Sequence, residues 1–299
     1  KCLMSTFQSE GYAQVIGGKI WYGISGDIAK NGAPLVVVHG GPGMSHDYLL
    51  PLAKLSKNRA VIFYDQLDAG RSDRPNEPKN WSIARFLDEI TTLTSILSLT
   101  KINLFGNSWG GTLSAAYAAT KPANLNRLIL SSPLICTSTW IKDSHVLRAN
   151  LPSETLKVME ICENRGDTDS QEYLDAVDIF YKTHLCRVDP WPDPVLKTMN
   201  LINSVCYEGM WGPNEFTCNG ILKNYDGSSD LHKIDVPTLV TCGDFDEATP
   251  KNTEKFSNMI PNSTFKSFKA SSHMAFIEEE LEYLDCLLYT SPSPRDLRK

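Results

Sequence analysis

A serine framed by glycines is the residue of this chain best suited to nucleophilic chemistry. The segment GNSWG at 106–110 has glycines two positions before and two positions after Ser108. An apolar run at 102–105 precedes it, and a helix-like run at 112–119 follows. In this strand–turn–helix context the glycines let strand and helix approach closely, which exposes the hydroxyl on a strained turn. The spacing therefore predicts a nucleophile rather than a serine in an ordinary glycine-rich loop.

A histidine that could activate this serine lies near the end of the chain. A serine hydroxyl needs a base to remove its proton, and a carboxylate should hold that base in the right tautomer. In hydrolases with this type of turn, the acid and then the histidine follow the serine along the chain. His273 follows a strand-like run at 264–269 and is predicted to be the base. For His145, His184 and His232, surface or packing roles are expected, because they fall in or beside helical stretches.

Two aspartates compete for the role of the acid. The segment GDFD at 243–246 follows a buried strand-like run at 238–242, so either side chain could face the carboxyl edge of a sheet. We favour Asp246. Asp244 is expected to cap the turn by bonding to its own backbone, as aspartate often does in loops.

A second glycine-rich segment, HGGPG at 39–43, follows the first buried strand-like run. Consecutive glycines allow a backbone N–H to point into a site. Together with the N–H of Trp109, the N–H of Gly41 would form an oxyanion hole for a tetrahedral intermediate. A phosphate-binding loop is the weaker alternative, because no Lys-Ser/Thr pair follows the glycines.

The elements that must position these residues alternate between strand and helix. Tyr12 to Ile16 and Lys19 to Ser25 flank two adjacent glycines, which predicts an antiparallel hairpin with positive φ at the turn. Continuous apolar runs suit parallel strands buried on both faces; they lie at 35–39, 60–64, 102–105 and 128–130. An amphipathic run at 82–99 predicts a helix capped by Ser82.

The domain organisation follows from where this alternation stops. We expect an α/β core at 10–132 and 233–288, with a mostly parallel, doubly wound sheet. Residues 133–232 carry amphipathic helices without strand-like runs, with a Trp/Pro-rich break at 189–194, and are expected to form an inserted helical cap. The polar, proline-interrupted tail at 289–299 is expected to be disordered or non-native.

Composition excludes several classes of protein. Of 299 residues, 41% are hydrophobic, which can fill a sizeable core, while 19 glycines and 17 prolines are an ordinary globular share. The net charge of −6, with no basic run, argues against nucleic acid as a partner. Eight cysteines without a CxxC pair, and histidines without metal-ligand spacing, predict reduced thiols, no metal and no cofactor. The first 30 residues lack an apolar segment and no run is long enough to span a bilayer, so we expect a cytoplasmic protein without a membrane partner.

These motifs together resemble the proline iminopeptidase family, serine peptidases of the α/β-hydrolase fold that include aminopeptidases cooperating with the tricorn protease. The resemblance covers about residues 10–287. It rests on six segments: HGGPG at 39–43, YDQ at 64–66 with GRS at 70–72, GNSWGG at 106–111, GMWGPNEF at 209–216, GDFDEATP at 243–250 and SHM at 272–274.

The resemblance implies roles for further residues. It carries over the serine, aspartate and histidine proposed above as the triad, with Gly41 and Trp109 as oxyanion donors. Two glutamates of this family hold the free α-ammonium of the substrate, and they match Glu215 and Glu247. An exopeptidase must recognise a positive amine at a fixed distance from its nucleophile, and a desolvated carboxylate pair would do so. Taken alone, each glutamate would more often be a solvated surface residue.

The chain departs from the family in two places. Asp68 stands where family members usually have glycine, but aspartate tolerates the left-handed conformation better than most residues, so we expect the turn to survive. The family's closing helix usually continues past Asp285, whereas here it runs into the Ser/Pro tail.

The leading functional interpretation is a serine exopeptidase that releases N-terminal residues, preferably proline, from small peptides or amino-acid amides. An esterase, lactonase or amidase on the same triad is the nearest alternative, and it would not need Glu215 and Glu247. A ligand-binding relative without turnover is an alternative of another class. The sequence leaves the oligomeric state open.

Overall fold

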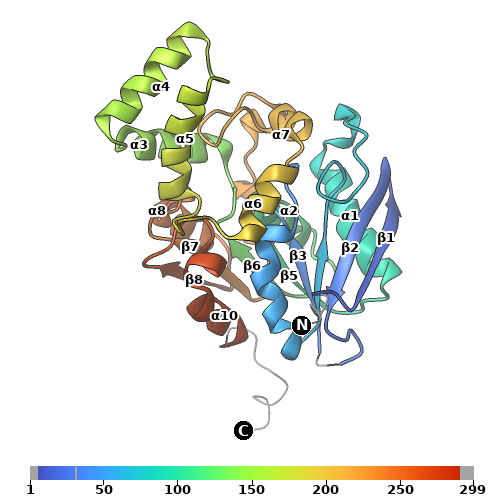
Figure 1. Ribbon diagram of the computed structural model, residues 1–299. Coiled ribbons are helices and arrows are strands. Elements are labelled where there is room, and N and C mark those ends of the chain that lie inside the picture. The colour runs from blue at the N-terminus through green and yellow to red at the C-terminus, as the bar shows by residue number, and fades with distance from the viewer. Residues whose placement is uncertain (1–5, 31, 290–299) are drawn as a thin grey trace, which may run out of the picture.

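An eight-stranded, mostly parallel sheet forms the centre of the molecule (Figure 1). The computed structural model describes residues 6–30 and 32–289. The strand order is β1-β2-β4-β3-β5-β6-β7-β8; the strands are β1 (Ser9–Val15), β2 (Gly18–Ser25), β3 (Leu35–Val38), β4 (Val61–Tyr64), β5 (Ile102–Asn107), β6 (Leu125–Ser131), β7 (Thr238–Gly243) and β8 (Ser263–Phe268). β2 is antiparallel to β1 and β4, and all other pairs are parallel. The predicted fold class, an α/β-hydrolase sheet with helices, is confirmed.

The hairpin at the start of the sheet differs from the prediction in its turn. Val15 pairs with Gly18, so the turn consists of Ile16 and Gly17. Gly17 alone takes a positive φ, 98°, whereas Gly18 already begins β2. The predicted antiparallel hairpin with positive φ at its turn is therefore confirmed, but Ile16 lies in the turn rather than in the first strand, and the second strand begins one residue before Lys19.

Helices cover the sheet and fill the long connection between β6 and β7. Those outside this connection are the 3-10 helices η1 (Asp47–Lys57) and η2 (Pro78–Asn80), and α1 (Ile83–Ile96), α2 (Trp109–Ala119), α8 (Pro250–Ser257), α9 (Ala275–Glu278) and α10 (Glu280–Tyr289). Those within it are α3 (Thr137–Ala149), α4 (Ser153–Arg165), α5 (Gln171–His184), α6 (Asp193–Leu201), α7 (Ser204–Met210), η3 (Ile221–Asn224) and η4 (Ser228–Lys233). Figure 1 shows α3, α4 and α5 as a lobe at one edge of the molecule.

The core follows from the alternation of side chains along fully buried strands. In β5, Leu104 belongs to the hydrophobic cluster on one face of the sheet, and Phe105 belongs to the cluster on the other face. A strand buried on both faces needs apolar residues at successive positions, which explains the continuous apolar runs. A third cluster, which includes Phe180 and Phe216, lies within the inserted segment and gives it a core of its own.

Two helical features were not expected from the sequence. η1, eleven residues long with Pro51 inside it, was not predicted at all. The predicted C-terminal helix is divided at Glu279, where φ is −128° and ψ is 50°. Ser82 caps α1 as predicted, by accepting a hydrogen bond from the backbone N–H of Arg85. Of the predicted tail, Tyr289 ends α10, and residues 290–299 lie outside the described residues.

Candidate active site

Ser108 lies on a strained turn between β5 and α2. Its φ of 56° and ψ of −120° are far from the conformations that L-residues usually adopt. The flanking glycines make room for this turn, because a Cβ at Gly106 would lie 2.2 Å from the carbonyl oxygen of Gly110. A Cβ at Gly110 would lie 2.0 Å from the carbonyl oxygen of Val38 on the neighbouring strand. Strand–helix contact at this point therefore excludes any side chain.

Asp246 and His273 form a buried hydrogen-bonded pair. The Oδ1 atom of Asp246 lies 2.8 Å from Nδ1 of His273. The same oxygen accepts the N–H of Ala248 at 2.8 Å, and Oδ2 accepts the hydroxyl of Ser132 at 2.5 Å and the N–H of Gly243 at 3.2 Å. These donors fix the carboxylate, which is oriented toward the imidazole and stays paired despite its burial.

The electrostatic surroundings of His273 favour its protonated form. Burial alone would lower the pKa of the imidazole, but the charge and hydrogen bond of Asp246, followed by the charge of Glu215, outweigh it and raise the pKa above 6.5. The ring also contacts Trp140 edge to face, with centroids 5.7 Å apart.

Two carboxylates hold the loop that carries this histidine. Glu278 accepts the N–H of Ser272 at 2.9 Å and its hydroxyl at 2.7 Å. Glu279 accepts the N–H of Ala270 at 3.0 Å. Both glutamates follow the loop directly in sequence, so the segment that presents the imidazole is fixed by local contacts.

Asp244 and His184, the other acidic and histidine candidates in this region, have different partners. Asp244 binds Nζ of Lys269 at 3.1 Å and accepts no hydrogen bond from the backbone within the described residues. The expectation that it caps the turn was therefore wrong, because Lys269, the residue directly after β8, binds its carboxylate. His184 contacts the carbonyl oxygen of Phe245 through Nδ1 at 2.7 Å, which is a packing role as expected.

The backbone N–H groups of Gly41 and Trp109 lie in the two segments beside the candidate nucleophile, the HGGPG loop and the start of α2. Neither of them donates a hydrogen bond within the described part of the chain. Gly41 and Ser108 both line a small cavity, and Trp109 is the first residue of α2, where N–H groups have no partner within the helix. An oxyanion beside Ser108 would therefore meet donors that are not already occupied.

Glu247 and Glu215 bring one buried and one half-buried carboxylate to this cavity. Glu247 is 1% exposed, and neither of its oxygens has a hydrogen-bond partner within the described residues. Oε1 of Glu247 lies 3.8 Å from Nδ1 of His273. Burial, and then the negative charges of Glu215 and Asp246, raise the pKa of Glu247 well above its usual value. A buried carboxylate without a partner is costly, so it points to a cationic ligand that is not part of the chain.

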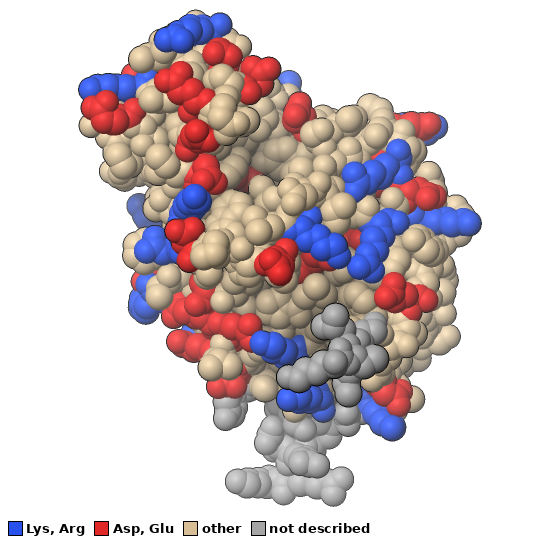
Figure 2. Space-filling view, viewed as in Figure 1, with Lys and Arg blue, Asp and Glu red and all other residues tan. Residues whose placement is uncertain are grey.

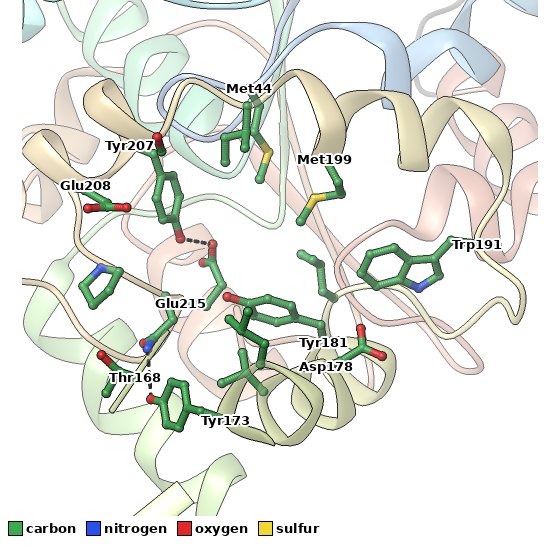
Figure 3. A pocket seen from close by; sticks show the side chains of 17 residues that line it. Met44, Thr168, Tyr173, Asp178, Tyr181, Trp191, Met199, Tyr207, Glu208 and Glu215 are labelled. Atoms are coloured by element: carbon green, nitrogen blue, oxygen red, sulfur yellow. Dashed lines mark hydrogen bonds between the residues drawn. The ribbon is translucent and has the colours of Figure 1, made fainter. Parts of the chain in front are cut away.

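Glu215 has one partner and a similar electrostatic environment. Its Oε1 accepts the hydroxyl of Tyr207 at 2.5 Å (Figure 3). Burial raises the pKa of Glu215, and the hydrogen bond from Tyr207 opposes that shift. Glu215 lines both the small cavity, of about 10 Å³, and an adjoining pocket of about 360 Å³.

The inserted segment supports the HGGPG loop directly. The N–H of Asn203, between α6 and α7, donates to the carbonyl oxygen of Gly43 at 2.8 Å. Thr198 of α6 accepts the N–H of Tyr48 through Oγ1 at 3.0 Å, and the same atom lies 3.1 Å from Oγ of Ser45. These bonds join the segment between β6 and β7 to the loop that carries Gly41.

Asp68 adopts the left-handed conformation expected for it, with φ of 65°. Its side chain does more than tolerate the turn. Oδ1 accepts the N–H of Asn76 at 2.7 Å, and Oδ2 accepts Nε1 of Trp81 at 2.8 Å. The side-chain amide of Asn203 donates to the backbone carbonyl oxygen of Asp68 at 2.9 Å. The aspartate that replaces a glycine thus cross-links its own loop.

Possible metal sites, membrane-spanning helices, cysteine pairing and surface charge bear on the expectations about cofactors and partners. Within residues 6–30 and 32–289, no group of His, Cys, Asp and Glu side chains is arranged to hold a metal ion, and no helix is both long and apolar enough to cross a bilayer. The seven described cysteines are free thiols. On the face in Figure 2, lysine and arginine are interspersed with aspartate and glutamate.

Comparison with known proteins identifies the family. Residues 33–170 match the alpha/beta hydrolase fold family. A proline iminopeptidase of Heyndrickxia coagulans is 41% identical over 92% of this chain and 96% of its own length. One from Saccharolobus solfataricus is 40% identical over 93% of this chain and 90% of its own length. The chain belongs to the proline iminopeptidase family.

Solved structures agree with this membership. A proline iminopeptidase of Mycobacterium smegmatis superposes with a TM-score of 0.86 at 31% identity, covering 93% of this chain and 96% of that one. The structure of VinJ superposes with a TM-score of 0.92 at 33% identity, covering 95% and 98%. The predicted resemblance to the proline iminopeptidase family is therefore confirmed.

Sequence reasoning missed two polar residues that contact the candidate site. Ser132, which binds Asp246, directly follows β6, and a polar residue at the carboxyl end of a parallel strand was an available signal. Tyr207, which binds Glu215, lies on α7 among other apolar and aromatic positions, and nothing in its spacing distinguishes it.

Proposed function

We propose that this chain is a serine exopeptidase that releases N-terminal residues, preferably proline, from small peptides or amino-acid amides. The observation that carries the proposal is the unpartnered, buried carboxylate of Glu247 beside Glu215, in the cavity that also contains Ser108 and His273. The α-ammonium of a peptide is a cation held at a short, fixed distance from the first carbonyl. Two carboxylates on one side of the nucleophile suit that arrangement, and family membership supports it.

The proposed reaction is acyl transfer through Ser108. His273 takes the proton of the hydroxyl as the oxygen attacks the first carbonyl, and the N–H groups of Gly41 and Trp109 stabilise the resulting oxyanion. His273 then protonates the leaving amine, which departs and leaves an acyl-enzyme. Water, deprotonated by the same imidazole, hydrolyses this ester and releases the N-terminal residue. Asp246 holds the imidazole in the tautomer that both steps require.

We also propose that residues 133–232 act as a cap over a catalytic domain made of 10–132 and 233–288. The separate hydrophobic cluster of the inserted helices and the position of Glu215 within them support this division. In this arrangement the catalytic domain supplies the nucleophile, acid and base, and the cap supplies one of the two carboxylates.

Glutamine substitutions test the substrate class. Glu215→Gln and Glu247→Gln should each lower kcat/KM for free-amine substrates by about 10- to 1000-fold, which corresponds to about 1.4 to 4 kcal/mol. Esters without an amine should be spared, and N-acetylated prolyl substrates should be poor for the unmodified enzyme. Ser108→Ala, measured alongside, should abolish turnover without loss of the fold.

The same experiment separates the alternatives. If both glutamine variants hydrolyse free-amine and blocked substrates with unchanged preference, the protein is a general esterase, lactonase or amidase. If the wild-type protein binds amines or peptides but turns over none, it is a ligand-binding relative without catalysis.

The pH profile offers an independent check. The imidazole of His273 acts as a base only when neutral, and its pKa is raised above 6.5, so activity should fall on the acidic side at a pH above 6.5. Activity should also fall above about pH 8 to 9 as the substrate amine loses its proton. For esters that lack an amine, only the acidic fall should remain.

A further inference from the structure

A large pocket adjoins the small cavity that contains Ser108. It has a volume of about 360 Å³ and is lined mainly by α5, α7 and the loop at 213–215, with Met199 from α6 (Figure 3). We call it the cap pocket. It shares Met44, Leu185 and Glu215 with the small cavity, whose volume is about 10 Å³. The two spaces are therefore neighbours, separated by these three side chains.

The walls of the cap pocket are apolar and its charges are of one sign. Val177 and Trp191 are among its apolar lining residues. The charged residues that line it are Asp178, Glu208 and Glu215, and the described lining includes no lysine, arginine or histidine. Asp178 pairs with Lys182 on the same helix at 2.9 Å, so Glu208 and Glu215 supply most of the negative charge that is left without a cation. Such a pocket favours apolar or cationic groups and disfavours anionic ones.

We propose that the cap pocket binds the part of a peptide substrate that follows the cleaved bond, and that it selects peptides with apolar or basic residues there. This proposal rests on the proposed exopeptidase function. The substrate of an exopeptidase has two parts. The N-terminal residue has a fixed length from its ammonium group to its carbonyl, whereas the leaving peptide varies in length. The confined cavity between Glu247 and Ser108 suits the fixed end, and the larger adjoining pocket suits the variable one.

The size of the small cavity supports this division. A volume of about 10 Å³ accommodates about one water molecule. An N-terminal residue is larger than this volume, and Met44, Leu185 and Glu215 line both spaces. Met44 and Leu185 are buried side chains at that boundary, and their displacement would join the cavity to the cap pocket. A small, compact residue such as proline needs the least displacement, whereas the leaving chain finds room that already exists.

Peptides that share N-terminal proline but differ in the second residue test this assignment. For the wild-type protein, kcat/KM should be higher for Pro-Leu-Gly and Pro-Lys-Gly than for Pro-Glu-Gly. Glu208→Lys should shift the ratio of the Lys to the Glu peptide by about three- to tenfold toward the Glu peptide at low salt. The matched control is Glu160→Lys, an exposed position on α4 outside the pocket lining, which should leave this ratio unchanged.

A steric variant probes the same space. Leu174 lines the cap pocket but is 49% exposed, so Leu174→Trp should narrow the pocket without disturbing the core. It should slow the tripeptides by about tenfold while sparing prolinamide, whose leaving group is only ammonia.

Several outcomes would overturn the assignment. One is an equal effect of Leu174→Trp on prolinamide and tripeptides, together with an unaltered Lys/Glu ratio in Glu208→Lys. Another is evidence that the cap pocket binds the N-terminal residue instead. In that case the relative rates for leucinamide, phenylalaninamide and prolinamide would differ, and Leu174→Trp would abolish the difference. A different result would refute the proposed function. The wild-type protein would then cleave prolinamide whether or not its amine is free, or would not cleave it at all.

A separate observation concerns the two sides of the oxyanion hole. The N–H of Gly40 donates to the hydroxyl oxygen of Tyr48 at 2.7 Å, and that hydroxyl donates to Oδ1 of Asn107 at 2.7 Å. Gly40 precedes Gly41 in the HGGPG loop, and Asn107 lies two residues before Trp109. One buried phenol thus bridges the segments that carry the two unoccupied N–H groups.

We infer that Tyr48 is a positioning residue that sets the separation of these two N–H groups. Asn107 is itself fixed, because its amide donates to the carbonyl oxygen of Ser131 at 3.1 Å, which also accepts the N–H of Ser108 at 3.1 Å. The bridge therefore ties the HGGPG loop to the backbone beside the nucleophile. Oxyanion stabilisation depends on donors held in place before the charge develops.

Tyr48→Phe removes the hydroxyl and keeps the ring. We expect kcat to fall by about 10- to 100-fold for amides and esters alike, with KM nearly unchanged. Affinity for a prolyl boronate, which forms a tetrahedral adduct on the serine, should fall in parallel, whereas affinity for the product proline should not. The control is Tyr117→Phe, which removes another hydroxyl bonded to an asparagine, Asn124, at the far end of α2.

The measurements should be made well below the melting temperature of each variant, because the loss of two buried hydrogen bonds also lowers stability. Unchanged kcat and boronate affinity in Tyr48→Phe would refute the inference. So would an equal loss of product and boronate affinity, since that would indicate general disruption of the site.

Discussion

Replacing Glu247 with glutamine should stabilise the unliganded protein at neutral pH while it impairs turnover of free-amine substrates. The carboxylate is 1% exposed, and both of its oxygens lack partners within the described residues. An amide has nearly the same shape but carries no charge, so the cost of burying an ionised group disappears. A residue that is kept for binding a cation thus weakens the fold when the cation is absent.

The pH dependence of this effect follows from the direction of the shift. Burial raises the folded-state pKa of Glu247 above the ordinary value of 4.5. Between 4.5 and the raised value, the folded protein binds more protons than the unfolded chain, so wild-type stability falls as pH rises through this window. One such group contributes a slope of up to about 1.4 kcal/mol per pH unit. Glu215, whose pKa is also raised by burial, adds to the slope.

Urea unfolding at pH 5, 6, 7 and 8 measures the difference. The free energy of unfolding of Glu247→Gln should exceed that of the wild type by an amount that grows with pH and then levels off. Glu208→Gln, an exposed carboxylate near the same pocket, is the control and should show no such trend. A difference that is independent of pH, or a variant less stable than wild type at pH 8, would refute the reasoning.

Three further outcomes are expected. Asp246→Asn should lower kcat by about 10⁴-fold because the bond that holds the imidazole tautomer is lost, whereas Asp244→Asn should stay within a few-fold of wild type in the same peptidase assay. Gly110→Ala should prevent accumulation of folded, soluble protein, because its Cβ would lie 2.0 Å from the carbonyl oxygen of Val38; normal expression and melting would contradict this. Asp68→Gly should lower the free energy of unfolding by about 1 to 3 kcal/mol, since it keeps the turn but leaves buried donors unpaired, and an unchanged denaturation midpoint would contradict it.

The central fold could be predicted because its signals are local and consistent. Buried parallel strands demand continuous apolar runs, and the glycines at 106 and 110 are required by a close approach of strand and helix. The context of the serine turn then identified which serine and which edge of the sheet to examine. The structure brings Asp246 and His273 into contact as the chain order suggested.

Other features depend on contacts between distant segments and had no local signal. η1 contains a proline, which argues against a helix at this position, and it is held by bonds to α6. The break at Glu279 arises where that carboxylate turns back to bind Ala270. The cap pocket combines side chains from three helices and a loop, so its size could not be inferred from any one of them.

Two hydrogen bonds, from the N–H of Tyr48 in η1 to Thr198 and from the N–H of Asn203 to Gly43, limit how the inserted segment can be exchanged between relatives. A chimera that imports all of residues 133–232 would replace Thr198, which secures η1, together with the cap pocket. A chimera that imports only α3 to α5 would retain α6, Asn203 and α7 and leave the oxyanion loop supported. Such a chimera would still replace Trp140 of α3, which contacts His273, so it would alter the surroundings of the base while the support of the oxyanion loop is kept.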